Sequence, residues 1–278
     1  MLTDNAIRDI IQRAFAEDLP DVTTEAIFDA EERGTAQLLV KERGVFAGAA
    51  FARAVFAMLD PDARFEALVA DGTHVEPGSI VATVHASVRA LLSGERTALN
   101  LVQRASGIAT TTRRYVDAVA GTRAKIYDTR KTAPGLRALD KYAVKAGGGE
   151  NHRHSLHDMV LIKNNHIDRA GSIGAAVDRI RARGVSQPIM IEVRDFEELE
   201  DALEAKPDFI LLDNMPVATL ARAVDLVAGA IPLEASGGIT LENVREVAET
   251  GVDRISVGAL THSVKALDIS MKVLSSGF

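Results

Sequence analysis

The first third of the chain mixes helical and strand-like patterns without regular alternation. Apolar residues at helical spacing predict helices over residues 3–18, 49–59 and 87–119. Alternating or short apolar runs predict strands over residues 34–42, 44–48, 64–70 and 71–84. Gly107 lies inside the long helical segment and predicts a break or bend there. Together these patterns indicate helices combined with an antiparallel sheet.

Beyond about residue 121, strand-like and helical segments alternate. Six short apolar runs predict strands over residues 124–127, 159–162, 189–193, 209–212, 232–235 and 254–257. Helices are predicted between them, over about residues 136–147, 171–183, 195–205, 216–229 and 240–250. Such alternation is typical of a parallel sheet with right-handed crossovers. Because six units are fewer than a closed α/β barrel needs, we predict an open, incomplete barrel, with a doubly wound open sheet as the alternative.

Cationic side chains follow two of these strands. Thr129, Arg130 and Lys131 come shortly after the first run, and Lys163 comes directly after the second. The segment between them holds His152 and Arg153. Parallel α/β sheets bind ligands at the carboxyl ends of their strands, so these clusters predict an anionic ligand. The alternative is that they belong to ordinary solvated loops.

Two carboxylates lie in or directly after later apolar runs. Glu192 is inside the run 189–193, and Asp213 follows the run 209–212. A carboxylate is costly to bury without a partner, so both are candidates for a functional site. A structural ion pair is the alternative for Glu192. For Asp213 the alternative is a helix cap, since Pro216 lies near the start of the next predicted helix.

Glycine-containing turns follow the last two predicted strands. One reads Ser236, Gly237, Gly238, and the other reads Val257, Gly258, Ala259. Glycines let backbone N–H groups approach an anion, and a following helix adds positive charge at its N-terminus. Paired turns on the final strands match the phosphate site that α/β barrels commonly carry. Ordinary turn chemistry is the alternative.

Composition narrows the choice of ligand. The chain has 278 residues and a formal net charge of -7, so its surface as a whole would repel nucleic acid. The local cations therefore favour a small anion. There is no cysteine, which excludes disulfides, thiolate metal sites and a cysteine nucleophile. We expect no membrane span, an amphipathic first helix in place of a signal peptide, and a cytoplasmic location.

The histidines give little support for a zinc site. His152, His154 and His157 cluster in the sequence, but no carboxylate stands at a familiar metalloenzyme spacing. Glu192 and Asp213 beside a phosphate site instead favour Mg²⁺ held jointly with substrate phosphates. Neither a P-loop nor a dinucleotide-binding fingerprint is present, so we expect no organic cofactor.

Several ordered motifs resemble those of the quinolinate phosphoribosyltransferase family. They are Glu95–Asn100 (ERTALN), Ser106–Thr110 (SGIAT), Asp128–Thr132 (DTRKT), Gly147–Gly149, Asn151–Arg153 (NHR) and Leu161–Lys163 (LIK). The resemblance extends from the first helix to Gly258. The family usually has Asp where this chain has Asn164, and Gly where it has Ser155.

The resemblance implies an architecture and a reaction. It implies an N-terminal α/β sandwich domain followed by an open α/β barrel catalytic domain. The change of pattern along the chain places these over residues 1–110 and 111–262, and the pattern also predicts a C-terminal helix over 263–278 that packs on the first domain. It implies transfer of phosphoribose from 5-phosphoribosyl-1-pyrophosphate to quinolinate with decarboxylation, which gives nicotinate mononucleotide for NAD synthesis. It also implies a homodimer or higher oligomer with shared sites, Mg²⁺ with the pyrophosphate, and neither nucleic-acid nor membrane partners.

The resemblance also assigns roles to individual residues. The quinolinate carboxylates are expected to meet Arg130, His152, Arg153, Lys163 and, from the neighbouring subunit, Arg96. Lys131 is expected at the pyrophosphate, with Thr129 completing the substrate-binding set. Glu192 and Asp213 are expected at the ribose hydroxyls and Mg²⁺. The 5-phosphate is expected at Ser236, Gly237, Gly238, Val257, Gly258 and Ala259. Lys131, Lys163, Glu192 and Asp213 form the predicted catalytic set.

Two other functions remain open from the sequence. One is a related pyrophosphorylase linked to molybdenum transport, which is similar in fold and in part of the motif set. The other is a non-catalytic phosphosugar-binding protein, which would be expected to lose the Arg and Lys set that is intact here. Turnover of quinolinate separates the first from the predicted activity.

Overall fold

The computed structural model describes residues 2–274. The chain forms two compact units. Unit 1 contains the chain up to residue 113, residues 132–148 and the chain from residue 260 onward, and unit 2 contains residues 114–131 and 149–259. The segment 132–148, which was expected in the barrel domain, therefore groups with unit 1.

Unit 1 combines helices with a four-stranded antiparallel sheet of order β12-β1-β5-β3 and a separate β2–β4 pair. Its strands are β1 (Arg33–Val40), β2 (Gly44–Val45), β3 (Arg64–Ala67), β4 (His74–Val75), β5 (Ile80–Ser87) and β12 (Ile269–Val273). Its helices are α1 (Asp4–Asp18), α2 (Val22–Ile27), α3 (Ala49–Leu59), α5 (Arg137–Ala146), α11 (Ala259–His262) and most of α4 (Val88–Ala118). In β1, Ala36, Leu38 and Val40 are buried and alternate with half-buried residues, as the period-two pattern predicted.

The long helix α4 is continuous through Gly107, so the predicted break at this residue is wrong. A β-carbon at this position would lie 2.1 Å from the carbonyl oxygen of Lys265. Glycine is therefore required for the close approach of two backbone segments, and its lower helix propensity is tolerated for that packing.

The C-terminal helix predicted over residues 263–278 is also wrong as far as the chain is described, to residue 274. The short helix α11 ends at His262, before this segment, and the segment instead contains the edge strand β12, which pairs antiparallel with β1 from Ala36↔Val273 to Val40↔Ile269. The helix α2 was not predicted, because its six residues follow Pro20 in what looked like a break. The Asp21 side chain caps this helix by accepting from the Thr24 N–H.

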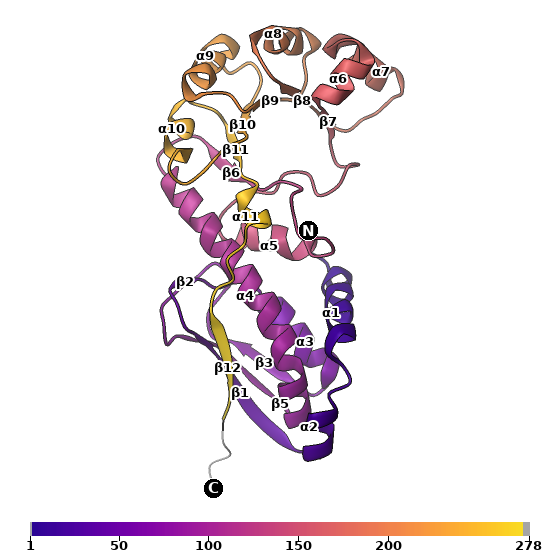
Figure 1. Cartoon of the computed structure of the whole chain (residues 1–278), viewed down its shortest axis with the longest axis vertical. Coiled ribbons are helices and arrows are strands. Elements are labelled where there is room, and N and C mark those ends of the chain that lie inside the picture. The colour runs from indigo at the N-terminus through magenta and orange to yellow at the C-terminus, as the bar shows by residue number, and fades with distance from the viewer. Residues whose placement is uncertain (1, 275–278) are drawn as a thin grey trace. The chain divides into compact units, whose positions relative to one another are not determined.

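Unit 2 is an open α/β barrel, as predicted. Six parallel strands stand in the order β6-β11-β10-β9-β8-β7, and helices α6 to α10 lie along the outer side of the curved sheet (Figure 1). The strands are β6 (Lys125–Tyr127), β7 (Val160–Ile162), β8 (Ile189–Val193), β9 (Phe209–Asp213), β10 (Leu233–Ser236) and β11 (Arg254–Ser256). The helices are α6 (Asn164–Ala170), α7 (Ile173–Ala182), α8 (Phe196–Ala205), α9 (Val217–Val227) and α10 (Val244–Glu249).

Strand register decides which side chains meet at the carboxyl ends of the sheet. Glu192 of β8 pairs with Leu211 of β9, and Leu211 pairs with Glu234 of β10. Two residues further along, Asp213 pairs with Ser236. Side chains two residues apart on a strand share a face, so these carboxylates lie on the same inner side of the barrel.

Candidate active site

A cleft of about 520 Å³ opens at the carboxyl ends of the strands of unit 2. Its walls contain most of the predicted site residues, together with several neighbours. The lining residues are Thr129, Arg130, Lys131, His152, Arg153, Leu161, Lys163, Glu192, Leu211, Asp213, Asn214, Glu234, Ser236, Gly237, Gly238 and Ser256. Residues from six strand ends and one loop thus converge on one site, as ligand sites of α/β barrels do.

The guanidinium groups of Arg130 and Arg153 form one wall of the cleft, the arginine wall, and are suited to bind an anion. The Nε–H of Arg130 is buried and has no hydrogen-bond partner among the described residues. Arg153 is held by a 3.0 Å bond that its Nη1 donates to the Met159 carbonyl. Burial and then the charge of Arg130 lower the pKa of Arg153. Two like charges near an unpaired donor are unfavourable without a ligand, and a carboxylate would satisfy both groups.

His152 is fixed at three points. Its backbone N–H donates to Oδ1 of the buried Asp128 at 2.8 Å. Its Nδ1 accepts a 2.8 Å bond from the N–H of Arg153, so Nδ1 is unprotonated and Nε2 carries the hydrogen. That Nε2 lies 3.5 Å from Oε1 of Glu234. The imidazole therefore has one defined orientation in the cleft.

Lys163 and Glu192 face each other across adjacent strand ends. The Lys163 Nζ lies 2.9 Å from Oε2 of Glu192, whose side chain is only 10% exposed. The backbone N–H of Lys163 also donates to Nδ1 of His166 at 2.9 Å, which fixes the start of α6. A buried carboxylate is tolerated here because it has a cationic partner.

Asp213 does not cap the helix that follows it. The N-cap of α9 is Pro216, with no side-chain hydrogen bond, so the capping alternative is wrong. The Asp213 side chain instead accepts from Nδ2 of Asn214 at 2.9 Å and lines the cleft. Its carboxylate is thus available at the mouth of β9.

The glycine turn after β10 closely approaches the side chain of Asn214, the residue after Asp213. Gly237 and Gly238 both have positive φ, 90° and 62°. A β-carbon on Gly237 would lie 2.2 Å from Oδ1 of Asn214. The helix α10 begins only at Val244, later than predicted, so the turn precedes a second turn and not the helix itself. An anion bound here would therefore contact backbone N–H groups of the turn, without added stabilisation from the dipole of a long helix.

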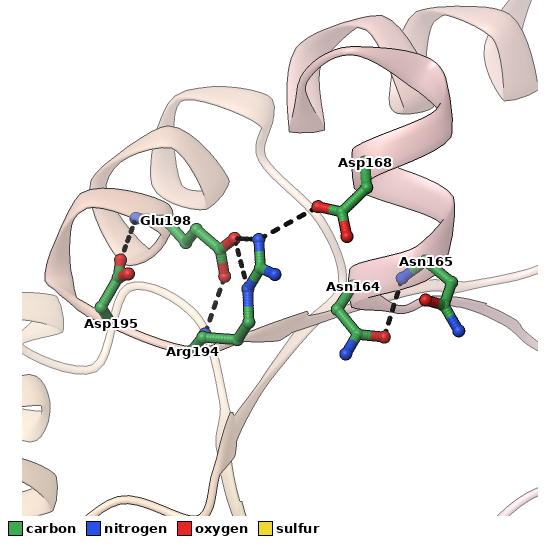
Figure 2. A network of polar contacts seen from close by, with 6 residues as sticks. All are labelled: Asn164, Asn165, Asp168, Arg194, Asp195 and Glu198. Atoms are coloured by element: carbon green, nitrogen blue, oxygen red, sulfur yellow. Dashed lines mark hydrogen bonds and ion pairs between the residues drawn. The ribbon is translucent and has the colours of Figure 1, made fainter.

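A polar network around Arg194 joins α6 and α8 to the end of β8 (Figure 2). Arg194, directly after β8, donates through Nε to Glu198 of α8 at 2.8 Å and through Nη2 to Asp168 of α6 at 3.3 Å. The bond with Glu198 is the main reason that the pKa of Arg194 is raised. Asp195 caps α8 by accepting from the Glu198 N–H at 2.9 Å. The network ties α6 to the end of β8.

Some predicted residues lie outside this cleft. Arg96 belongs to α4 in unit 1 and is exposed. The turn Val257–Ala259 does not line the cleft, and the N–H of Val257 donates to the Tyr127 carbonyl at 2.9 Å. Ser256 faces the cleft in its place. The assignment of Val257, Gly258 and Ala259 to the phosphate remains a prediction.

Glu234 is an ionisable cleft residue that was not predicted from the sequence. It is completely buried, and burial raises its pKa to about 7. An acidic residue inside an apolar run was the available signal, since the same signal identified Glu192.

Within residues 2–274, no group of three or more His, Asp or Glu side chains is gathered as a metal site would require. His154 and His157 belong to a surface loop in which Asp158 accepts from the N–H groups of His154 and Ser155. The same part of the chain contains no helix with the length and apolar character needed to cross a membrane.

Comparisons with known proteins agree with the geometry. Residues 21–106 match the model of the quinolinate phosphoribosyl transferase N-terminal domain, and residues 108–272 match that of its C-terminal domain. The chain is 47% identical over 282 residues to nicotinate-nucleotide pyrophosphorylase (carboxylating) of Mycobacterium leprae, covering 98% of this chain and 99% of that one. It is 45% identical over 273 residues to a probable enzyme of the same name from Bacillus subtilis, covering 97% and 94%. A crystal structure of NadC from Streptococcus pyogenes superposes with a TM-score of 0.93 at 40% identity, covering 98% and 97%.

Proposed function

Because this chain belongs to the quinolinate phosphoribosyltransferase family, we propose that its barrel cleft carries out the family's reaction with the residues described above. The reaction joins quinolinate to the sugar of 5-phosphoribosyl-1-pyrophosphate, with loss of pyrophosphate and CO₂. It yields nicotinate mononucleotide for NAD synthesis. We also propose the cytoplasm as its compartment, which cell fractionation can check.

The observation that carries this proposal is the arginine wall. Arg130 has a buried, unpartnered Nε–H, and Arg153 lies within its electrostatic reach. Guanidinium groups bind carboxylates through two parallel hydrogen bonds, which suits a planar dicarboxylate better than a point charge would. Quinolinate therefore fits these residues of the cleft, together with Lys163 at the end of β7.

The residues contributed by β8, β9 and the turn after β10 suit the sugar donor. Loss of pyrophosphate builds positive charge at the sugar C1, which the carboxylates of Glu192 and Asp213 can stabilise. The turn Ser236–Gly238 offers backbone donors for the 5-phosphate. Lys131, exposed at the rim, is suited to the leaving pyrophosphate. After CO₂ departs, the electron pair at the ring carbon lies beside the cationic ring nitrogen, which stabilises it.

The residues present fit Mg²⁺ bound mainly through the substrate. Mg²⁺ commonly uses one or two protein carboxylates plus substrate phosphates. Glu192 and Asp213 supply those two carboxylates within the cleft. When bound with the diphosphate, Mg²⁺ would neutralise charge on the leaving group.

The direct test is product formation from the two proposed substrates. Purified protein with quinolinate, 5-phosphoribosyl-1-pyrophosphate and Mg²⁺ should release nicotinate mononucleotide and CO₂ in equal amounts, measured by chromatography and by trapping carboxyl label. Omission of either substrate is the control. Binding of the sugar donor without turnover of quinolinate would contradict the proposal and favour a phosphosugar-binding role.

We further propose that the protein is at least a homodimer and that Arg96 serves the cleft of a second copy. Arg96 is exposed on α4 of unit 1, whereas every residue that lines the cleft belongs to unit 2. An exposed guanidinium is available to a partner and could add a further carboxylate contact. This assignment follows the family resemblance and needs its own test.

Subunit mixing provides that test. The Arg96→Ala and Lys163→Ala proteins should each be nearly inactive. If Arg96 acts on the partner, a mixed dimer has one cleft with both changes and one with neither, so exchange should restore about half of the wild-type activity per mixed dimer. Native mass measurement confirms the exchange. Confirmed exchange without recovery would rule out the shared site.

A further inference from the structure

Glu234 is an ionisable group at the floor of the cleft that the proposed reaction does not yet use. Its side chain is 1% exposed, and neither carboxylate oxygen has a hydrogen-bond partner of good geometry among the described residues. It nevertheless lines the cleft. Burial of a carboxylate with few donors is unfavourable for its charged form, so burial favours the neutral acid.

The groups around Glu234 explain its state. From β11, Arg254 and the Ser256 hydroxyl favour the charged form, and from the end of β6 the buried Asp128 opposes it. Arg254 is also engaged over the rings of Tyr127 and Phe209, at 5.0 and 3.8 Å from their centroids. Burial is the largest effect and raises the pKa of Glu234 to about 7.

The imidazole of His152 also faces Glu234 in the cleft. Its Nε2 lies 3.5 Å from Oε1 of Glu234, and its Nδ1 is occupied by the Arg153 N–H. A proton on Nε2 or on Glu234 can therefore lie between the two groups. From β9, the residue in register with Glu234 is Leu211, which brings no charge.

We propose that Glu234 is a positioning residue that acts as a neutral acid, sharing a proton with His152 so that Glu234 adds no negative charge to the cleft floor when the dicarboxylate binds. This inference rests on the proposed function, because it concerns the wall assigned to quinolinate. An ionised Glu234 beside Asp128 would repel the quinolinate dianion. It would also accept the Nε2–H of His152, which would then not be available to quinolinate.

The proposal predicts a pH-dependent affinity for quinolinate. As the pH rises through the pKa of Glu234, this residue adds a negative charge to the cleft floor and the affinity for quinolinate falls. If the ionised form binds poorly, the Kd rises roughly tenfold between about pH 6 and pH 8. Glu234→Gln mimics the neutral acid, so its Kd should change far less. The exposed Glu197→Gln is the matched control and should behave like wild type.

Titration calorimetry measures both affinity and proton uptake. Wild type should take up protons when it binds quinolinate near pH 8, and Glu234→Gln should take up fewer. An affinity for wild type that stays constant over this range, without proton uptake, would overturn the proposal. This wild-type measurement decides the question even if the variant fails to fold.

Thermal unfolding without any substrate tests the neutral state of Glu234 separately from the assignment of quinolinate to the cleft. The native protein binds the Glu234 proton more tightly than the unfolded chain, so this contribution to stability is full below about pH 4.5 and is lost as the pH rises through about 7. The Tm of Glu234→Gln should therefore rise relative to wild type between pH 5 and 8. A constant Tm difference would overturn the neutral acid. The expected Tm behaviour without quinolinate binding at any pH would support the neutral acid and overturn the quinolinate assignment.

Discussion

The edge strands and the central strands of the barrel contribute opposite chemistry to the cleft. β6 and β7 stand at the two edges of the sheet, and the segments that follow them or join them carry Arg130, Arg153 and Lys163. The central strands β8 and β9 carry Glu192 and Asp213 on the strands themselves. Cations on loops can adapt to a substrate, whereas carboxylates on paired strands are held in place.

This difference suggests a division of labour. The edge residues recognise the anionic ring, and the central residues act on the charge that develops during transfer. Substitutions of the central carboxylates should therefore lower kcat, substitutions of the edge cations should raise KM for quinolinate, and a change in the central phosphate turn should raise KM for the sugar donor. The three predictions below test that distinction.

The largest effect is expected at the centre, from Asp213→Asn. Because the carboxylate does not cap α9, its loss should leave the Tm nearly unchanged. If it stabilises charge at the sugar, kcat should fall by about 10²- to 10³-fold, the effect of removing one preorganised electrostatic group. Steady-state kinetics and thermal unfolding measure the two quantities. The exposed Asp225→Asn is the charge-matched control, and a variant of Asp213 with full activity would refute the assignment.

An intermediate effect is expected at the edge, from Arg130→Lys. Lysine keeps the charge but cannot make a bidentate pair, so quinolinate binding should weaken by about 10- to 100-fold, equivalent to one or two charge-assisted hydrogen bonds. Affinity for the sugar donor should change little. Separate titrations with each substrate give the comparison, with the exposed Arg169→Lys as the control. Equal losses for both substrates would remove the distinction between edge and centre.

The same comparison shows what could be read from the sequence. Glu192 and Asp213 were identified because each is an acidic residue in or directly after a short apolar run, which predicts a strand. The position of a residue along a strand determines the face of the sheet to which its side chain points. Two features depend on how loops fold back over the sheet, and no local sequence pattern encodes them. They are the contact of His152 with Glu234 and the proximity of Arg130 to Arg153. The strand β12 was missed for a related reason, since its partner β1 lies at the other end of the chain.

Glycine positions show the same limit more sharply. The turn at Gly237 and Gly238 was predicted from composition, and both residues do have positive φ. The close approach of Gly237 to Asn214 was not predictable, because it joins the ends of two strands. Gly107 was interpreted as a helix break because its tertiary contact with Lys265 cannot be recognised from the sequence.

The smallest of the three effects is expected from Gly237→Ala, which tests whether the central strands also hold the 5-phosphate through backbone. Alanine at a φ of 90° is strained, and its β-carbon would displace the Asn214 side chain, which now lies 2.2 Å from that position. About 1–2 kcal/mol of strain at the turn should raise KM for the sugar donor by roughly 5- to 30-fold. Quinolinate affinity should be unchanged, because the arginine wall lies on the edge segments.

A second glycine separates backbone strain from loss of the phosphate site. Gly229 also has a positive φ, of 78°, but a β-carbon there meets nothing within 4 Å. Gly229→Ala should therefore lower the Tm through strain alone and leave both KM values unchanged. If Gly237→Ala behaves the same way, its turn has only a structural role and the phosphate must bind elsewhere. A rise in donor KM for Gly237→Ala alone would assign the phosphate to the turn after the central strand β10, and not to the edge segments that carry the arginines.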